Sequence, residues 1–469
     1  MGYPDDIEYE ESSKKINNER ERLINALLKN NEGIISELDI ELVDDILNYL
    51  IEKNQFDKAL ICIESLLKFF PYSNEIWQRK AVIYDHKGEY SKAIECFDKA
   101  ISINPGDEEV LINKGITYDN AGKFREALET FEQVLSLSPN NIDALFNKGL
   151  VLEKLDEFEL ATECFSRIIE LEPMHKDSYY ELGYCYDYTD RLEEALVSYD
   201  KHLSIIPFNY NAWYNRGVVL SRMGRYYHSI ESYETALSIN PRFAAAWYNK
   251  GNAYAALGIL TRAVEDYLTA LSLNRKDVFT LYNLAGAYEQ LGRYEEAIET
   301  YTKAISFDKS HYESYFNRGN CYYQLEDFNK ALRDYNHALS IFSDNAELWY
   351  AKADAEYNTG RFAEAISSYR KVLLLDPENH EAKLDLANIL IECELYDEAE
   401  ENLKSLTICK PEWAEPYYLL SKLYFVTGEI EKGLINLEIA FAFNPHERFE
   451  YNFEDDWEMI IKFLLSRTG

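Results

Sequence analysis

Asparagine side chains recur at a spacing of 34 residues along much of the chain. They are Asn113, Asn147, Asn215, Asn249, Asn283 and Asn317, and Glu181 occupies the position between Asn147 and Asn215. An asparagine amide both donates and accepts hydrogen bonds, so a column of amides can pair with the backbone of an extended peptide of any sequence. The pattern therefore predicts a peptide-binding surface. The alternative is that Asn is simply common at this position.

An acidic column and an apolar column share the same spacing. The acids are Asp85, Asp119, Glu153 and Asp187, and the apolar residues are Val82, Ile116, Leu150 and Tyr184. The acids fall late in an expected helix, where the helix dipole disfavours negative charge, so the dipole does not explain them. An apolar floor with an acidic margin favours a basic-amphipathic protein segment, with charge mainly setting association rate and selectivity. A solvated helix face is the alternative interpretation.

No catalytic or metal-binding spacing is visible in the sequence. The chain contains neither an H-E-x-x-H pair nor a C-x-x-C pair, so no zinc site is predicted. Gly122-Lys123 suggests a phosphate-binding loop, but Thr117 and Phe124 stand where that motif needs Gly and Ser or Thr. We therefore expect a protein that is not an enzyme and that binds no cofactor and no metal.

The charge and the cysteines limit the classes of partner and compartment. A formal net charge of −35 argues against binding nucleic acid, because phosphate contacts require a basic face. It permits a basic partner, and the alternative is that an acidic surface simply keeps a long array soluble. Seven Cys without paired spacing predict packing residues in a reducing compartment, and Cys62, Cys96 and Cys164 share one register. With no secretory leader pattern and no long apolar run, we expect a cytoplasmic protein without membrane insertion.

The elements that must position these columns follow from a repeat. From Ile40 to Glu447 the chain fits twelve units of 34 residues, the period of a helix–turn–helix array. The twentieth residue of every unit is small and the twenty-fourth is large, which places both on one helix face. The eighth residue is Gly, Ala or Ser in every unit except the first, which has Leu47. This pattern predicts two closely packed helices per unit.

Turn and stop residues mark the ends of these helices. The fifteenth residue is Gly in seven units, with Asn54, Asp156 and Asp190 as acceptable left-handed substitutes and Glu326 and Glu394 as poorer ones. Nine of the eleven prolines fall where the second helix should end.

Three consecutive units lack that proline and carry Arg275, Lys309 and Ser343 instead. Either these junctions form a hinge, or other turn chemistry ends the helices there.

The frame also predicts the boundaries of the chain's segments. We expect a disordered acidic tail at residues 1–12, an N-terminal capping helix at 13–39, twelve repeats at 40–447 and a C-terminal capping helix at 448–469. The last helix has an apolar stripe, so its alternative role is to dock a partner or a second copy of the chain.

One unit displays the whole pattern with Trp77, Ala81, Tyr84, Gly88, Ala93, Phe97, Ala100 and Pro105. The units resemble tetratricopeptide repeats over about 408 of the 469 residues. The resemblance implies an all-α fold, a right-handed α-solenoid (superhelix) of antiparallel helix pairs. It also implies a concave groove, lined by the first helices, that binds peptides or proteins. Arrays of this family seldom catalyse reactions.

We therefore predict a non-catalytic scaffold or adaptor for protein–protein interactions, which binds extended or helical protein segments in its groove. The alternative is a self-assembling structural array, a homo-oligomer formed through the terminal helices.

Overall fold

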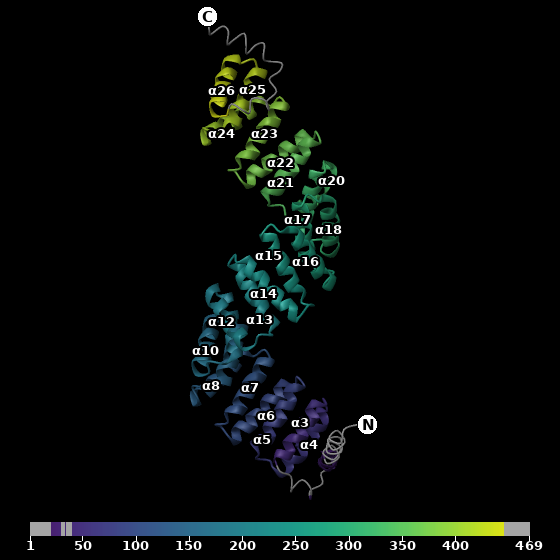
Figure 1. Ribbon diagram of the computed structural model, residues 1–469, viewed down its shortest axis with the longest axis vertical. Helices are drawn as coiled ribbons and strands as arrows, with labels where there is room; N and C mark the ends of the chain where they lie inside the picture. The colour runs from purple at the N-terminus through teal and green to yellow at the C-terminus, as the bar shows by residue number, and fades with distance from the viewer. Residues whose placement is uncertain (1–19, 30–32, 34–39, 445–469) are drawn as a thin grey trace. The chain divides into compact units, whose positions relative to one another are not determined.

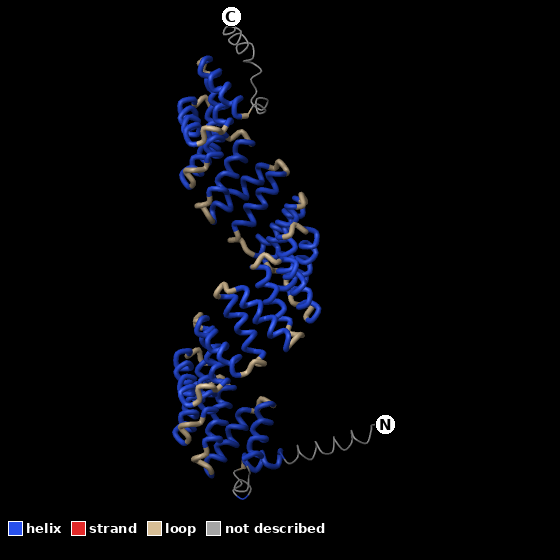
Figure 2. The backbone as a smooth tube through the Cα atoms, turned by 60° about the vertical axis from the view of Figure 1, so that its left-hand side comes forward, coloured by secondary structure: helices blue, strands red, loops and turns tan. Residues whose placement is uncertain are grey.

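The computed structural model describes residues 20–29, 33 and 40–444. All regular secondary structure in these residues is helical (Figure 2). The predicted tail at 1–12 and the predicted final helix at 448–469 lie outside the described residues. Residues 20–28 are helical and lie within the predicted capping segment 13–39, and Leu27 is fully buried in the cluster that contains Ile46 and Leu47. The segment boundaries themselves stay a prediction.

Each 34-residue unit folds into two helices, and the first helix begins at the first residue of the predicted unit. The first helices are α3 (Ile40–Glu52), α5 (Asn74–His86), α7 (Glu108–Asn120), α9 (Ile142–Lys154), α11 (Lys176–Tyr188), α13 (Tyr210–Arg222), α15 (Ala244–Ala256), α17 (Val278–Gln290), α19 (Tyr312–Gln324), α21 (Ala346–Asn358), α23 (His380–Glu392) and α25 (Ala414–Val426).

The second helices are one residue longer than the first. They are α4 (Phe56–Phe69), α6 (Tyr90–Ile103), α8 (Phe124–Leu137), α10 (Phe158–Leu171), α12 (Leu192–Ile205), α14 (Tyr226–Ile239), α16 (Leu260–Leu273), α18 (Tyr294–Phe307), α20 (Phe328–Ile341), α22 (Phe362–Leu375), α24 (Tyr396–Cys409) and α26 (Ile430–Phe443).

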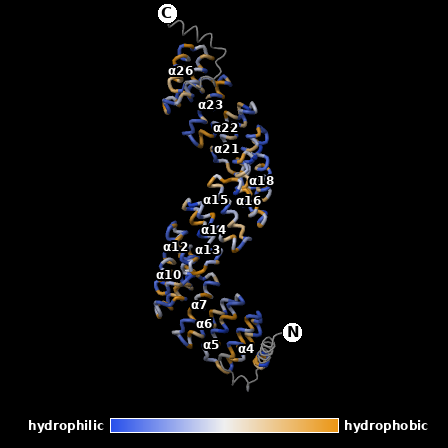
Figure 3. The backbone as a smooth tube through the Cα atoms, viewed as in Figure 1, coloured by the Kyte–Doolittle hydropathy of each residue, from blue (hydrophilic) through white to orange (hydrophobic). Residues whose placement is uncertain are grey.

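The chain divides into two compact units, Met1–Ile239 and Asn240–Gly469, which we call the N-terminal and C-terminal units. Within each, the two helices of a pair pack against each other, and each pair packs against the next (Figure 1). Apolar and polar residues alternate along the helices, as expected for elements buried on one side (Figure 3). The predicted all-α solenoid of antiparallel helix pairs is confirmed in each unit.

The small and large residues of each pair form the core. The twentieth and twenty-fourth residues of the described units are buried throughout. At the eighth position the aromatic ring of residue twenty-four lies directly on the glycine. A Cβ added to Gly149 would lie 2.5 Å from the Phe165 ring, and one added to Gly217 would lie 2.6 Å from the Tyr233 ring. The eighth residue is therefore small because the ring of the second helix occupies that space.

The turns inside the units have the predicted left-handed conformation. Seven glycines there have positive φ, and so do Asn54, Asp156 and Asp190. Glu326 and Glu394 adopt φ values of 60° and 61° without the help of a glycine or a short polar side chain. Packing of the adjacent helices therefore holds these two glutamates in a conformation that they rarely adopt.

The junctions without proline end their helices with the same backbone bond as the others. The N–H groups of Asn274 and Asp308 each donate to the carbonyl four residues earlier at 2.9 Å, as that of Ser138 does at 2.8 Å before Pro139. At the third such junction Trp349 Nε1 donates to the Ser343 carbonyl at 2.8 Å. The hinge suggested by the missing prolines stays a prediction.

The cysteines of the shared register are packing residues, as expected. Cys62, Cys96 and Cys164 are buried in the helix clusters of the N-terminal unit, and burial raises the pKa of Cys62 and of Cys96 to about 11. All seven cysteines are free thiols.

Candidate functional site

All fourteen residues predicted to form the binding surface lie on first helices and are half-buried. In the N-terminal unit they are Val82, Asp85, Asn113, Ile116, Asp119, Asn147, Leu150, Glu153, Tyr184, Asp187 and Asn215, on α5, α7, α9, α11 and α13. In the C-terminal unit they are Asn249, Asn283 and Asn317, on α15, α17 and α19. Their role in peptide binding stays a prediction, and the contacts below sharpen it.

Several asparagines tie neighbouring repeats together. Asn215 Nδ2 donates to Tyr180 Oη at 3.1 Å, across a sequence separation of 35 residues. Asn283 and Asn317 make the equivalent bonds to Tyr248 and Tyr282, at 3.0 and 2.9 Å. Each bond uses one of the four hydrogen-bonding positions of an amide, so these amides can still bind a peptide with the remaining ones.

Asn147 departs from that arrangement. Its amide donates to the carbonyl of Asp143 in its own helix at 2.8 Å. The fifth residue of the unit before it is Ile112, which has no hydroxyl to offer. A tyrosine at that position is therefore the sequence signal for the tie between repeats.

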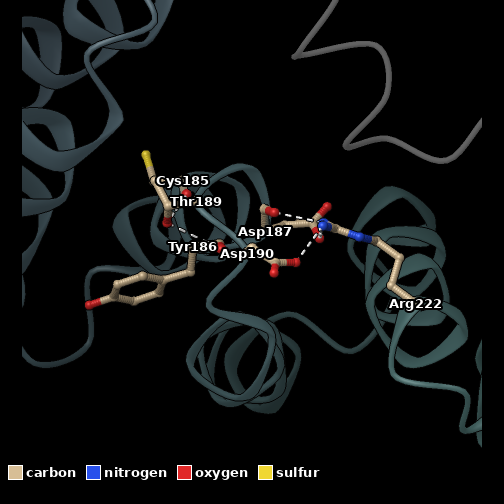
Figure 4. Close-up of polar contacts among 6 residues, drawn as sticks. All are labelled: Cys185, Tyr186, Asp187, Thr189, Asp190 and Arg222. Atoms are coloured by element: carbon tan, nitrogen blue, oxygen red, sulfur yellow. Dashed lines mark hydrogen bonds and ion pairs between the residues drawn. The ribbon is translucent and has the colours of Figure 1, made fainter.

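Three of the four acids in the predicted column also bind the following repeat, again 35 residues on. Asp119 forms an ion pair with Lys154 at 2.7 Å, and Asp85 accepts from Asn120 at 3.2 Å. Asp187 pairs with Arg222, whose second terminal nitrogen lies 2.8 Å from Asp190 (Figure 4). Cations of the chain itself thus compensate part of the predicted negative stripe.

Glu153 and Glu181 form a different environment on α9 and α11. Glu153 accepts a hydrogen bond from Cys185 Sγ at 3.1 Å, and burial raises the pKa of its carboxyl to about 7. Burial and the nearby charge of Glu153 raise the pKa of Glu181 to about 8. These carboxyls are therefore partly protonated at neutral pH, so this part of the column carries less negative charge than its sequence suggests.

The C-terminal unit contains three neighbouring cavities that share lining residues, which we together call the tyrosine groove. The largest, of about 440 Å³, is lined by Asn252, Ala255, Leu260, Tyr267, Tyr282, Asn283, Gly286, Ala287, Glu289, Gln290, Tyr301 and Asn317. A second, of about 340 Å³, shares Glu289 with the first, and a third, of about 260 Å³, shares Tyr323, Tyr350 and Asp354 with the second. First helices α15 to α23 supply most of the lining. Two predicted residues, Asn283 and Asn317, lie in this groove.

The floor of the groove is polar because tyrosines beneath it supply hydroxyl groups. Tyr267 Oη donates to Asn252 at 2.7 Å, and Tyr335 Oη donates to Asn320 at 2.9 Å. Tyr369 makes the equivalent bond to Asp354. Each tyrosine is the twenty-fourth residue of its unit, and each acceptor is the ninth.

The N-terminal unit contains the apolar counterpart, which we call the phenylalanine face. There Val82, Ile116 and Leu150 are the ninth residues, and each packs in the same cluster as the ring of its own unit. Those rings are Phe97, Phe131 and Phe165, which have no hydroxyl. In these three units the ninth and twenty-fourth residues form an apolar pair, whereas in the units of Tyr267, Tyr335 and Tyr369 they form a hydrogen-bonded pair.

Three carboxylates that line the tyrosine groove were not predicted from the sequence. Tyr301 Oη donates to Glu289 at 3.0 Å, and Tyr350 donates to Asp385. Burial raises the pKa of Glu289 and of Asp385, and it raises that of Asp354 to about 6. Within the described residues no Lys, Arg or His forms an ion pair with any of the three. They occupy different positions of the repeat, so no single column revealed them.

Comparison with protein families identifies the repeat. Tetratricopeptide repeat models match residues 75–107, 108–141, 142–175, 176–209, 210–243, 244–277, 277–344 and 359–423. The chain belongs to the tetratricopeptide repeat (TPR) family. This confirms the resemblance found in the sequence. In general terms, TPR arrays act as scaffolds for protein interactions and are typically non-catalytic.

Solved structures also resemble the chain in part. MamA is 27% identical, and the match covers 34% of this chain and 95% of MamA with a TM-score of 0.34. YrrB, described as a TPR protein with an unusual peptide-binding site, is 21% identical over 40% of this chain and 96% of its own, with a TM-score of 0.36. The C-terminal part of a TPR protein from Cytophaga hutchinsonii is 18% identical over 50% of this chain and 97% of its own, with a TM-score of 0.45. A comparison with curated proteins finds no match.

The described part of the chain also bears on two other classes of function. None of its helices combines the length and the apolar character needed to cross a bilayer. No group of three or more His, Cys, Asp or Glu side chains there is arranged to hold a metal ion.

Proposed function

We propose that the chain is a non-catalytic interaction scaffold and that the tyrosine groove binds an extended segment of a partner protein. The observation that carries this proposal is a row of three cavities that share lining residues and extend across α15 to α23. Neighbouring first helices lie about 10 Å apart in ordinary packing, and an extended chain advances about 3.3–3.6 Å per residue. One repeat would therefore contact about three residues of the segment.

The lining supports binding through backbone as well as side chains. Amides from Asn283, Asn317 and Asn320 can donate and accept, and tyrosine rings offer broad apolar surfaces with a polar edge. Each neutral hydrogen bond contributes only about 0.5–1.5 kcal/mol net, so affinity must come from several repeats acting together. A segment that spans the three cavities meets this requirement. The cytoplasmic location stays a prediction.

Site-specific photocrosslinking in native cells tests the proposal. A benzoylphenylalanine side chain replaces Gln290, which is exposed and lines the 440 Å³ cavity of the groove, and in a control replaces Glu299, which is exposed on α18. We expect an adduct with a partner protein from position 290 and none from position 299. Adducts from position 299 alone would place binding on the second helices and contradict the proposal. An adduct of twice the chain mass would instead favour the self-assembling array.

A further inference from the structure

The charge of the tyrosine groove has one sign. Its three cavities are lined by Glu289, Glu347, Asp354 and Asp385, and none of their lining residues in the described chain is Lys, Arg or His. Tyrosine hydroxyl groups satisfy three of these carboxylates with neutral hydrogen bonds. A neutral donor leaves the full negative charge of a carboxylate uncompensated.

In the N-terminal unit, two acids of the predicted column have cationic partners. Asp119 and Asp187 are paired with Lys154 and Arg222 of the following repeat. The thirteenth residue of the repeat supplies both cations, whereas the residue in the same register after Glu289 is Gln324, which carries no charge. The chain therefore provides cations for two acids of the N-terminal unit, whereas the described lining of the tyrosine groove contains none.

We propose that the tyrosine groove selects a basic partner segment, with Glu289 and Asp354 each receiving the ammonium or guanidinium group of a Lys or Arg side chain. This inference rests on the proposed function and adds the chemistry of the segment. A carboxylate beside aromatic rings is a good environment for a cation, because both the charge and the ring faces attract it. Glu289 lies with Tyr301 on its side of the groove, and Asp354 lies among Tyr323, Tyr350 and Tyr369.

The spacing of the two acids defines the segment further. Glu289 lies on α17 and Asp354 on α21, two repeats away. With about 10 Å between neighbouring first helices, an extended segment needs two cations roughly six residues apart to reach both. The cavity at Glu289 has room for a long side chain because Gly286 lines it. A Cβ added at Gly286 would meet only Tyr301 Oη, at 3.7 Å.

Selection from a random dodecapeptide library on the full-length protein tests the inference. We expect Lys or Arg to be enriched at two positions about six residues apart. The Glu289→Gln/Asp354→Asn variant keeps acceptors for Tyr301 and Tyr369 but removes both charges, and it should bind a selected peptide at least tenfold more weakly. Gly286→Leu fills the cavity without changing the charge and should weaken binding of the same peptide.

A charge-matched control separates the groove from the acidic surface as a whole. Glu299 and Glu364 are exposed on α18 and α22, so Glu299→Gln/Glu364→Gln removes the same net charge outside the groove. We expect less than a twofold change in affinity. Equal losses in both double variants would overturn the inference in favour of diffuse attraction. Peptides that crosslink at position 290 but lack enriched Lys and Arg would also overturn it, while leaving the proposed function intact. A failure to crosslink at position 290 would overturn both.

Discussion

The phenylalanine face and the tyrosine groove are built from the same repeat but differ beneath the first helices. In the phenylalanine face, Leu150 packs against the apolar cluster that contains Phe165. In the tyrosine groove, Asn320 accepts a hydrogen bond from Tyr335 at the same two positions. A hydroxyl group in the second helix thus allows a polar side chain in the first. The comparison shows how one fold provides two surfaces of different chemistry without altering its backbone.

The two regions also differ in how acids are balanced. Lys154 and Arg222 form ion pairs with Asp119 and Asp187 of the N-terminal unit. Glu289 and Asp385 in the tyrosine groove receive only tyrosine hydroxyl groups. The tyrosine groove is therefore the region in which a cation of a partner can pair with carboxylates that have no cationic partner in the described chain.

The largest effect is expected when a polar residue is placed over a phenylalanine. Leu150→Asn removes apolar burial and places an amide where Phe165 offers no hydroxyl, so the free energy of unfolding should fall by about 3 kcal/mol. Adding Phe165→Tyr should restore about 1 kcal/mol through a new hydrogen bond. Urea unfolding of the single and double variants measures both. Strictly additive effects would show that the two positions are not coupled.

A smaller, pH-dependent effect is expected for Glu181→Gln. Burial raises the folded-state pKa of Glu181 to about 8, above the ordinary value of a glutamate. The contribution of this carboxyl to folding stability is therefore complete below about pH 4.3 and is lost as the pH rises through 8. The substitution should therefore stabilise the protein by about 2 kcal/mol at pH 8.5 and by much less at pH 5. Urea unfolding at the two pH values measures this. Asp119→Asn, which breaks the pair with Lys154, should stabilise at neither pH.

Removing a hydroxyl from the tyrosine groove should cost about 1 kcal/mol. Tyr335→Phe leaves the Asn320 oxygen without its donor, so the free energy of unfolding should fall by about that amount. Tyr233 is the matched control because the ninth residue of its unit is Val218, and Tyr233→Phe should change stability by less than about 0.5 kcal/mol. Equal losses in the two variants would contradict the pairing of polar residues with tyrosines.

The smallest effect concerns the turns inside the repeats. The non-glycine turn residues are Asn54, Asp156 and Asp190 in the N-terminal unit but Glu326 and Glu394 in the C-terminal unit. Glutamate tolerates positive φ less well, so Glu394→Gly should stabilise by about 0.7 kcal/mol. Asp156→Gly should give a smaller gain. The melting temperatures of the two variants compare the turns directly, and a larger gain for Asp156→Gly would contradict this account.

The sequence predicts the fold well because its signals are local. The start of each first helix, the left-handed turn and the small eighth residue each depend on residues of one unit, and all occur at the same positions in the repeat frame. The buried pair of residues twenty and twenty-four also follows from helix geometry alone.

The candidate site is predicted less completely because its contacts join different units. The bond from Asn215 to Tyr180 and the pair of Asp187 with Arg222 each span 35 residues. A column of one residue type does not reveal such a partner in the next repeat. The three groove acids that accept from tyrosines come from the sixth, ninth and twelfth positions, so they assemble only when successive helices are placed side by side. The tyrosine at position twenty-four was a sequence signal for Asp354 alone, which is the ninth residue of its unit.

We expect the partner to bind the tyrosine groove and not the phenylalanine face. Gln290 and Asn120 occupy the same position of the repeat on α17 and α7, and both are exposed. Photocrosslinkers placed at each residue in turn therefore sample the two regions with one geometry. We predict that position 290 yields most of the partner adduct and position 120 little. Equal yields, or a higher yield at position 120, would contradict this expectation.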